Sequence, residues 1–172
     1  YFLFVGRLEE KKNLVRLVRA FHFFHEKNPG WKLVLAGKRG LGFKKLYDEV
    51  GRMKLWDCVL MPGYVTESEK SSLFRDSRGF VFPSLYEGFG LPVLEAFYFE
   101  KPVLAGNAGA LPEVCGDSAI LVDPMDEMAI FHGLEKLKNA RDLVEKGKER
   151  LKYFDWKVSA RKTLDVIMKE IR

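Results

Sequence analysis

Short apolar runs alternate along the chain with stretches whose apolar residues recur at helical spacing. The apolar runs predict strands at 1–5, 31–37, 57–63, 79–84, 101–106 and 119–124. The other stretches predict helices at 13–27, 41–53, 68–75, 91 onward, 127–138, 141–152 and 156–171. Several strands are apolar at successive positions, which is typical of strands buried on both faces of a sheet.

This regular alternation of strand and helix predicts an α/β fold. We expect a Rossmann-like, doubly wound parallel sheet of about six strands with helices on both faces, formed by one domain over 1–172. Such sheets bind ligands beyond the carboxyl ends of their strands. The informative segments are therefore the loops that follow the strands: 6–13, 37–42, 62–67, 83–91 and 105–112.

The loop 83–91, PSLYEGFGL, joins a predicted strand to a helix and contains Glu87, Gly88 and Gly90. Free backbone N–H groups at a helix start form an anion site, and glycines let the backbone approach a ligand closely. Glu95 follows on a helix that is otherwise apolar. Because carboxylates repel phosphate, we expect both glutamates to accept hydrogen bonds from hydroxyls, such as those of a sugar nucleotide. The alternative for Glu95 is that it satisfies neighbouring backbone N–H groups.

The loop 6–13, GRLEEKKN, carries two cations that can reach the same crevice. Arg7 leaves the end of the first strand, and Lys12 lies just before the next helix. Together they fit a diphosphate clamp, with a guanidinium fork and an ammonium point charge. The alternative is that the loop's lysines pair with its own two glutamates. The glycine-rich, basic loop 37–42 is a weaker signal, because a plain turn is the favoured explanation for it.

Composition and charge narrow the class of protein without naming a ligand. With 47% hydrophobic and 31% charged residues, the chain resembles soluble globular proteins, and no apolar run reaches the ~20 residues that span a bilayer. The net charge of +5 suits a phosphate ligand, anionic lipid or nucleic acid, but an ordinary solvated surface is the favoured explanation. Cys58 and Cys115 lack metal-ligand spacing, so we expect buried thiols in a reducing, cytoplasmic compartment.

Other chemistries find little support in the sequence. The histidines show no HExxH spacing, and no GxSxG, GxGxxG or P-loop motif is present. The basic stretch 141–152 is interpreted as a solvated helix face, so we expect no nucleic-acid partner, and membrane attachment through this stretch is a weaker alternative. The chain opens inside a predicted core strand, so we expect it to be the C-terminal piece of a longer protein.

Five segments together resemble one family. They are, in chain order, FVGRLEEKKN, LVLAGKRG, PGYVTESEK, VFPSLYEGFGLPVLEAF and GNAGALPEV with AILVDPMD. This series resembles the C-terminal half of a retaining GT-B glycosyltransferase of group 1 (family 4), over nearly the whole chain. Its most specific feature is the E-x7-E motif formed by Glu87 and Glu95. The closing YFDWKVSARKTLDVI resembles the family's final helix, which packs back towards the other domain.

The resemblance implies a role for each matching residue. Arg7 and Lys12 match the pair that neutralises the donor diphosphate, Glu87 matches the glutamate that faces the transferred sugar, and Glu95 matches the one that binds the ribose hydroxyls. The implied catalytic set is therefore Arg7, Lys12 and Glu87. The implied substrate-binding set is Gly6, Gly37, Lys38, Val65, Gly88, Phe89, Gly90, Leu91 and Glu95. No DxD motif occurs, so we expect no metal and no cofactor besides the nucleoside-diphosphate sugar donor.

The resemblance also implies a partner and exposes one departure. The acceptor-binding N-terminal domain is absent from this chain, so we expect donor binding with weak or no hexosyl transfer by this half alone. Any peripheral membrane contact, at the inner face of the membrane, is expected only through that missing half. The alternative is a non-catalytic nucleotide-sugar or phosphate-binding module that acts with a separate subunit. Glu100 stands where the family usually has a glycine, so we expect strain at that helix end or a different helix end.

Overall fold

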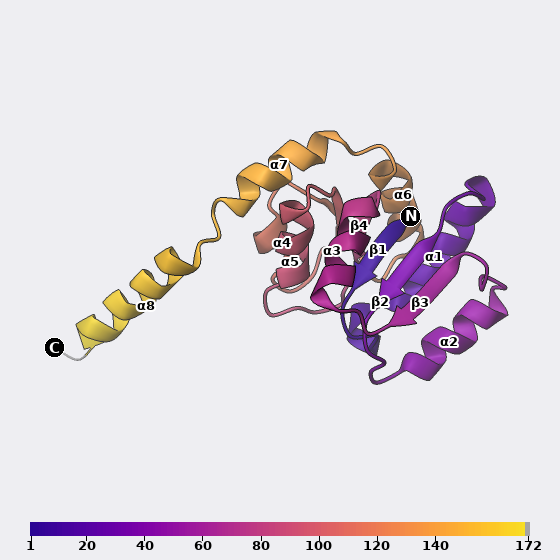
Figure 1. Cartoon of the computed structure of the whole chain (residues 1–172), viewed down its shortest axis with the longest axis horizontal. Coiled ribbons are helices and arrows are strands. Elements are labelled where there is room, and N and C mark those ends of the chain that lie inside the picture. Colours follow the sequence, from indigo (N-terminus) through magenta and orange to yellow (C-terminus); the bar gives the residue numbers. More distant parts are fainter. Residues whose placement is uncertain (171–172) are drawn as a thin grey trace.

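A six-stranded parallel sheet lies at the centre of the computed structural model, which describes residues 1–170 (Figure 1). Its strands are β1 (Phe2–Val5), β2 (Leu33–Ala36), β3 (Val59–Gly63), β4 (Gly79–Phe82), β5 (Val103–Gly106) and β6 (Ile120–Val122). The helices are η1 (Glu10–Lys12), α1 (Leu14–Lys27), α2 (Phe43–Arg52), α3 (Glu67–Asp76), α4 (Leu91–Tyr98), α5 (Leu111–Cys115), α6 (Glu127–Leu137), α7 (Asp142–Leu151) and α8 (Trp156–Glu170).

The order of the strands confirms the predicted doubly wound fold. Read across the sheet, the order is β3-β2-β1-β4-β5-β6, and every neighbouring pair is parallel. The direction of winding reverses between β1 and β4, which pair through Phe2 and Gly79. Helix α1 packs against both α2 and α6, whereas α4 packs against α7 on the other side of the sheet (Figure 1). The reversal makes the β1–β4 boundary the place where a ligand crevice is expected.

The core explains why the strands are apolar at successive positions. Every residue of β2, β4 and β5 is buried, as predicted for strands covered on both faces. Phenylalanine rings fill the space between the strands; those of Phe4 and Phe82 stack with their centroids 5.7 Å apart. The edge strand β3 differs, because Leu60 and Pro62 are exposed there. Pro62 has no N–H to offer a further strand, which protects this edge from pairing.

Side chains cap the starts of two helices. The Thr66 side chain accepts a hydrogen bond from the Glu69 backbone, and the Glu69 side chain accepts one in return, which forms a capping box at α3. Asp126 accepts hydrogen bonds from two backbone N–H groups and caps α6. The prediction missed η1 and α5, which lie in segments interpreted as loops. Both are too short to show helical periodicity.

The end of α4 carries the strain that the unusual Glu100 suggested. Glu100 has a φ of 56°, in the left-handed region that favours glycine. The Lys101 N–H binds the Ala96 carbonyl at 2.9 Å and the Glu100 N–H binds the Phe97 carbonyl at 3.0 Å. These two bonds form a Schellman motif, so the helix ends as it does with glycine, at the cost of a strained glutamate.

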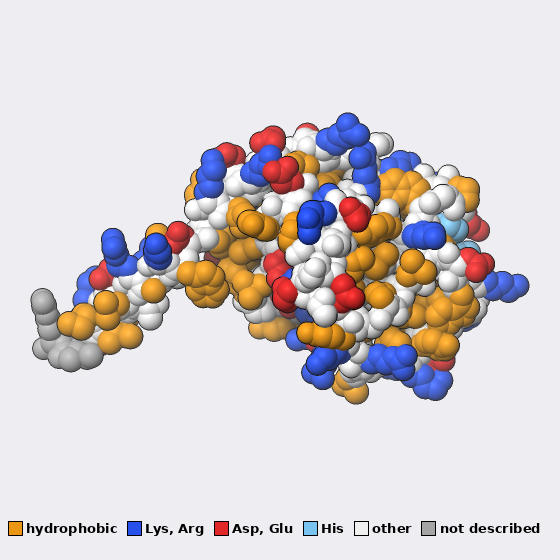
Figure 2. All heavy atoms as spheres, in the orientation of Figure 1, with side chains coloured by type: hydrophobic (Ala, Val, Ile, Leu, Met, Phe, Trp, Pro, Cys, Tyr) orange, Lys and Arg blue, Asp and Glu red, His pale blue; other side chains and the backbone are white. Residues whose placement is uncertain are grey.

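Helix α8 stands apart from the body of the molecule (Figure 1). All of its residues are exposed, and Figure 2 shows apolar side chains along one side of it and basic ones along the other. The exposed apolar residues are Trp156, Val158, Leu164, Val166, Ile167 and Met168. The predicted helix ended at Ile171, which lies outside the described residues. Within residues 1–170, no helix is both long enough and apolar enough to cross a membrane.

Candidate functional site

The loops after β1 and β4 meet at the point where the sheet reverses its winding. The Leu85 N–H binds the Lys11 carbonyl at 2.8 Å, which joins the two loops directly. Buried Asn13 ties them further: its side-chain amide donates to the Pro83 carbonyl at 3.1 Å and to the Pro124 carbonyl at 2.6 Å. These bonds hold the loops 6–13 and 83–91 in one fixed arrangement.

Lys12 and Glu87 form an ion pair across this junction. The Lys12 Nζ lies 2.5 Å from Glu87 Oε1, and each side chain is only 11% exposed. The same ammonium lies 5.0 Å above the centre of the Phe82 ring, at the end of β4. The alternative that Lys12 pairs within its own loop is therefore wrong. The other half of that alternative is confirmed, because the Lys11 Nζ lies 3.4 Å from Glu9 Oε1. Glu10 pairs with Lys45 on α2.

The backbone of Glu87 is fixed by the segment that follows β5. The Ala110 N–H binds the Glu87 carbonyl at 3.1 Å. Gly109, with φ of +58°, lies so close that a Cβ there would sit 2.9 Å from that carbonyl oxygen. A larger residue at position 109 would therefore clash with the Glu87 backbone. The glycines of this loop were visible in the sequence, but their contact with Glu87 was not.

A pocket of about 320 Å³ opens at the carboxyl ends of β1, β2 and β3. Five of the predicted site residues line it: Gly6, Arg7, Gly37, Lys38 and Val65. Tyr64, Glu67 and Lys70 also line the pocket, and sequence reasoning did not select them. The Lys38 ammonium lies 4.8 Å from the centre of the Tyr64 ring, so this exposed aromatic carries a cation on its face.

The walls of the pocket come together because of Gly37. Its φ is +148°, and a Cβ built on it would lie 1.8 Å from the Gly6 carbonyl oxygen. No side chain fits between the loops after β1 and β2, so only glycine permits this approach. The weak glycine signal of the loop 37–42 therefore reflects a close backbone contact rather than a plain turn.

Glu95 reaches the edge of this pocket through Lys70. The Lys70 Nζ lies 2.9 Å from Glu95 Oε1 and 2.8 Å from Glu67 Oε2. Although burial acts to lower the pKa of Lys70, hydrogen bonds to the two glutamates raise it overall. The alternative that Glu95 satisfies backbone N–H groups is wrong, because its carboxylate accepts a hydrogen bond from Lys70 of α3 instead. This contact resolves the apparent conflict of a charged residue on an apolar helix.

The glycine loop 88–91, although predicted to bind the substrate, does not line this pocket. Gly90 is buried at the N-terminus of α4, whereas Gly88 and Leu91 are exposed. Phe89 is 43% exposed, and its ring packs edge-on against Phe154, with centroids 5.7 Å apart. The loop therefore contacts the segment between α7 and α8.

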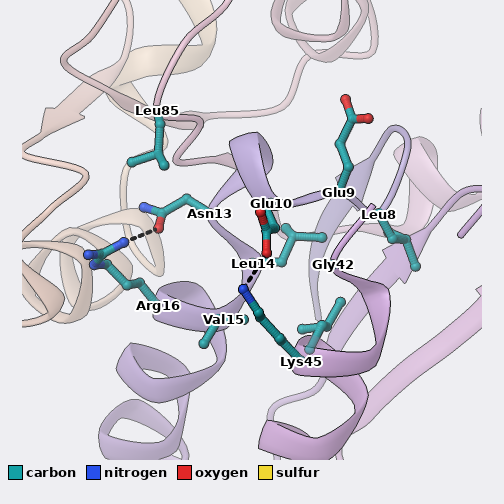
Figure 3. A pocket seen from close by; sticks show the side chains of 11 residues that line it. Leu8, Glu9, Glu10, Asn13, Leu14, Val15, Arg16, Gly42, Lys45 and Leu85 are labelled. Atoms are coloured by element: carbon teal, nitrogen blue, oxygen red, sulfur yellow. Dashed lines mark hydrogen bonds and ion pairs between the residues drawn. The ribbon is translucent and has the colours of Figure 1, made fainter. Parts of the chain in front are cut away.

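A second hollow, of about 290 Å³, lies between η1, α1 and α2 (Figure 3). Leu8, Leu14 and Leu85 contribute apolar surface to it. Its charged groups already have partners: Lys45 binds Glu10 at 2.6 Å, and Arg16 donates to the Asn13 side chain at 3.1 Å. Because these cations are engaged, the hollow suits an anionic ligand less well than the first pocket. Within residues 1–170, no cluster of His, Cys, Asp or Glu is arranged to hold a metal ion.

Charged side chains thus lie at the carboxyl ends of the strands in a doubly wound α/β domain, the edge at which such folds bind ligands. The chain belongs to the family described as glycosyl transferases, group 1, which matches residues 1–153. Within that family it corresponds to the C-terminal half of a GT-B glycosyltransferase, as the order of its motifs predicted.

Individual relatives support the assignment. The O-antigen chain mannosyltransferase B of Escherichia coli is 35% identical over 170 residues, which cover 96% of this chain and 45% of the relative. Sucrose-phosphate synthase from Thermosynechococcus elongatus has a TM-score of 0.85 at 26% identity, covering 99% of this chain and 45% of that one. The C-terminal domain of a group 1 glycosyl transferase from Francisella tularensis has a TM-score of 0.77 at 28% identity, covering 88% of this chain and 84% of that one. The chain spans about half the length of the curated relative.

Proposed function

We propose that this chain is the donor-binding half of a retaining glycosyltransferase and that it binds a nucleoside-diphosphate sugar. The observation that carries the proposal is that cations and carboxylates lie together at the carboxyl ends of neighbouring strands. Arg7 lines the pocket, and the Lys12–Glu87 pair lies at the neighbouring β1–β4 junction. A diphosphate needs the cations, and the sugar rings on either side of it need acceptors for their hydroxyls.

The cations act on the leaving group. When the glycosyl bond breaks, negative charge develops on the diphosphate, and fixed positive groups stabilise that charge more in the transition state than in the ground state. We assign this role to Arg7 and Lys12, in place of a bound metal ion. Glu87 is a positioning and electrostatic residue for the transferred sugar, because its contact with Lys12 ties the sugar side of the site to the phosphate side.

The nucleoside occupies the pocket after β2 and β3. Gly37 and Val65 frame the base, with Lys38 beside it, and Glu95 accepts hydrogen bonds from the ribose hydroxyls. Backbone N–H groups of residues 88–91 surround the sugar and phosphates, because the start of α4 adds a favourable dipole there. The support for this arrangement is that Gly37, Lys38 and Val65 line the same pocket.

A second domain completes the cleft in our proposal. It carries the acceptor and excludes water from the transfer step, so the present half binds the donor but transfers poorly by itself. The apolar side of α8 packs on that domain. The alternative, a non-catalytic donor-binding module that works with a separate subunit, gives the same donor affinity. Product analysis by NMR with a polypeptide containing both domains separates the two, because only the enzyme yields a glycoside with the donor's anomeric configuration.

Isothermal titration calorimetry with UDP-, GDP- and ADP-sugars tests donor binding. We expect one nucleotide class to bind, with affinity reduced at least roughly tenfold in Arg7→Ala and in Glu95→Ala, because each loses a charged hydrogen bond. Arg39→Ala is the matched control. Arg39 lies on the loop after β2, its guanidinium carbon lies 4.8 Å from the centre of the Phe43 ring, and it does not line the pocket. Binding is expected to be unchanged by EDTA. No heat with any donor, or equal affinities in all variants, contradicts the proposal.

A further inference from the structure

Lys70 occupies a position that the donor-binding proposal leaves without a role. It lies on α3, its side chain is 17% exposed, and its ammonium bridges Glu67 and Glu95. It also lines the pocket together with Arg7 and Lys38. A lysine that only kept the surface soluble would need no such partners. The two carboxylate contacts at the pocket wall therefore indicate a further role for Lys70.

The surroundings of Glu95 show what this lysine does. The neighbours of Glu95 on α4 are apolar, and Leu94 and Ala96 are buried. Its side chain is 37% exposed. Among the described residues, Lys70 is its hydrogen-bond partner, through Oε1. Without Lys70, no hydrogen bond within residues 1–170 holds this carboxylate in place.

We propose that Lys70 is a positioning residue that fixes the Glu95 carboxylate for the ribose hydroxyls of the donor, while Glu67 anchors Lys70 from outside. This inference rests on the proposed function and adds a residue to it. Lys70 restricts Glu95 before the ligand arrives, which removes an ordering cost from binding.

The competing role for Lys70 is direct contact with the phosphates. Nucleotides that lack a ribose hydroxyl separate the two roles. A residue that acts through Glu95 matters only when the hydroxyl is present, whereas a phosphate contact matters equally for ribose and deoxyribose. The probes are UDP, GDP and ADP, each compared with its 2′-deoxy and 3′-deoxy counterparts by calorimetry.

For Lys70→Met we expect affinity for the ribonucleotide to fall about 3- to 10-fold, the effect of one side chain that is no longer pre-ordered. The affinity of at least one deoxynucleotide is expected to change less than twofold, so the preference for ribose shrinks. Lys70→Arg is expected to restore most of that preference, because a guanidinium can bridge the same two carboxylates. Glu67→Gln is expected to give an intermediate value.

Lys148→Met is the matched control. Lys148 also bridges two carboxylates, those of Glu100 and Glu145, each at 3.1 Å, but it does so on α7 and outside the pocket lining. We expect it to leave all nucleotide affinities unchanged, with thermal unfolding recorded for every variant.

Each remaining outcome points to a different conclusion. Equal losses for ribose and deoxyribose ligands in Lys70→Met overturn the positioning role in favour of phosphate contact. Unchanged affinities in Lys70→Met, with the unmodified chain still binding a nucleotide, overturn this inference and leave donor binding intact. If the unmodified chain binds none of the probes, donor binding itself fails and the role of Lys70 fails with it.

Discussion

Glu49 of α2 belongs to a series of ion pairs that connects α1, α2 and α6. Its substitution tests how much this series contributes to the free energy of unfolding. Its carboxylate lies 2.5 Å from Arg52 of α2 and 2.5 Å from Arg19 of α1. Arg19 in turn lies 2.9 Å from Glu127 of α6. The Glu49 side chain is only 9% exposed. Hydrogen bonds from Arg52 and then from Arg19 lower the pKa of Glu49 from its usual 4.5 to about 2, against the effect of burial.

This pKa shift converts into stability. The change from 4.5 to about 2 is worth about 3 kcal/mol at ~1.4 kcal/mol per pKa unit. Because the folded-state pKa of Glu49 lies below the unfolded one, the stabilisation is fully present above pH 4.5 and is lost as the pH falls to about 2. We therefore expect Glu49→Gln to lower the free energy of unfolding by about 3 kcal/mol at pH 7, and the gap to close in strong acid.

Urea unfolding followed by circular dichroism, at several pH values from neutral to strongly acidic, measures this difference. Glu149→Gln is the control: Glu149 also contacts a cation, Lys152 at 2.6 Å, but its side chain is 67% exposed. An exposed pair of this kind contributes about 0–1 kcal/mol. A Glu49→Gln variant as stable as the unmodified chain at pH 7, or a gap that persists in strong acid, refutes the reasoning.

Three further results are expected. Gly37→Ala should lower the unfolding free energy by about 3 kcal/mol or more, seen as a large drop in thermal midpoint, because the new Cβ would lie 1.8 Å from the Gly6 carbonyl oxygen. Glu100→Gly should raise the urea midpoint by the equivalent of about 0.5–1 kcal/mol, since glycine adopts the φ of 56° without strain; a lower midpoint contradicts this. Burial raises the pKa of the Cys115 thiol to about 12 and also raises that of Cys58. Both thiols should react with a disulfide reagent only as fast as the chain unfolds, and prompt labelling of the folded chain refutes their burial.

The sequence by itself determined the six strands, the longer helices and the class of fold. Strands buried on both faces show as unbroken apolar runs, and the longer helices show as apolar residues at helical spacing. These signals depend on residues within a few positions of one another, so periodicity is enough to locate them. The loops at the strand ends were located for the same reason, together with Glu87 and Glu95.

Only the tertiary structure decided which side chains meet in those loops. Lys12 pairs with Glu87, 75 positions away, rather than with the glutamates beside it, and Lys70 of α3 holds Glu95 of α4. Such partners follow from the order of the strands and from the close approach of backbones at Gly37 and Gly109. Local sequence does not encode that approach, because it is set by the packing of the whole sheet.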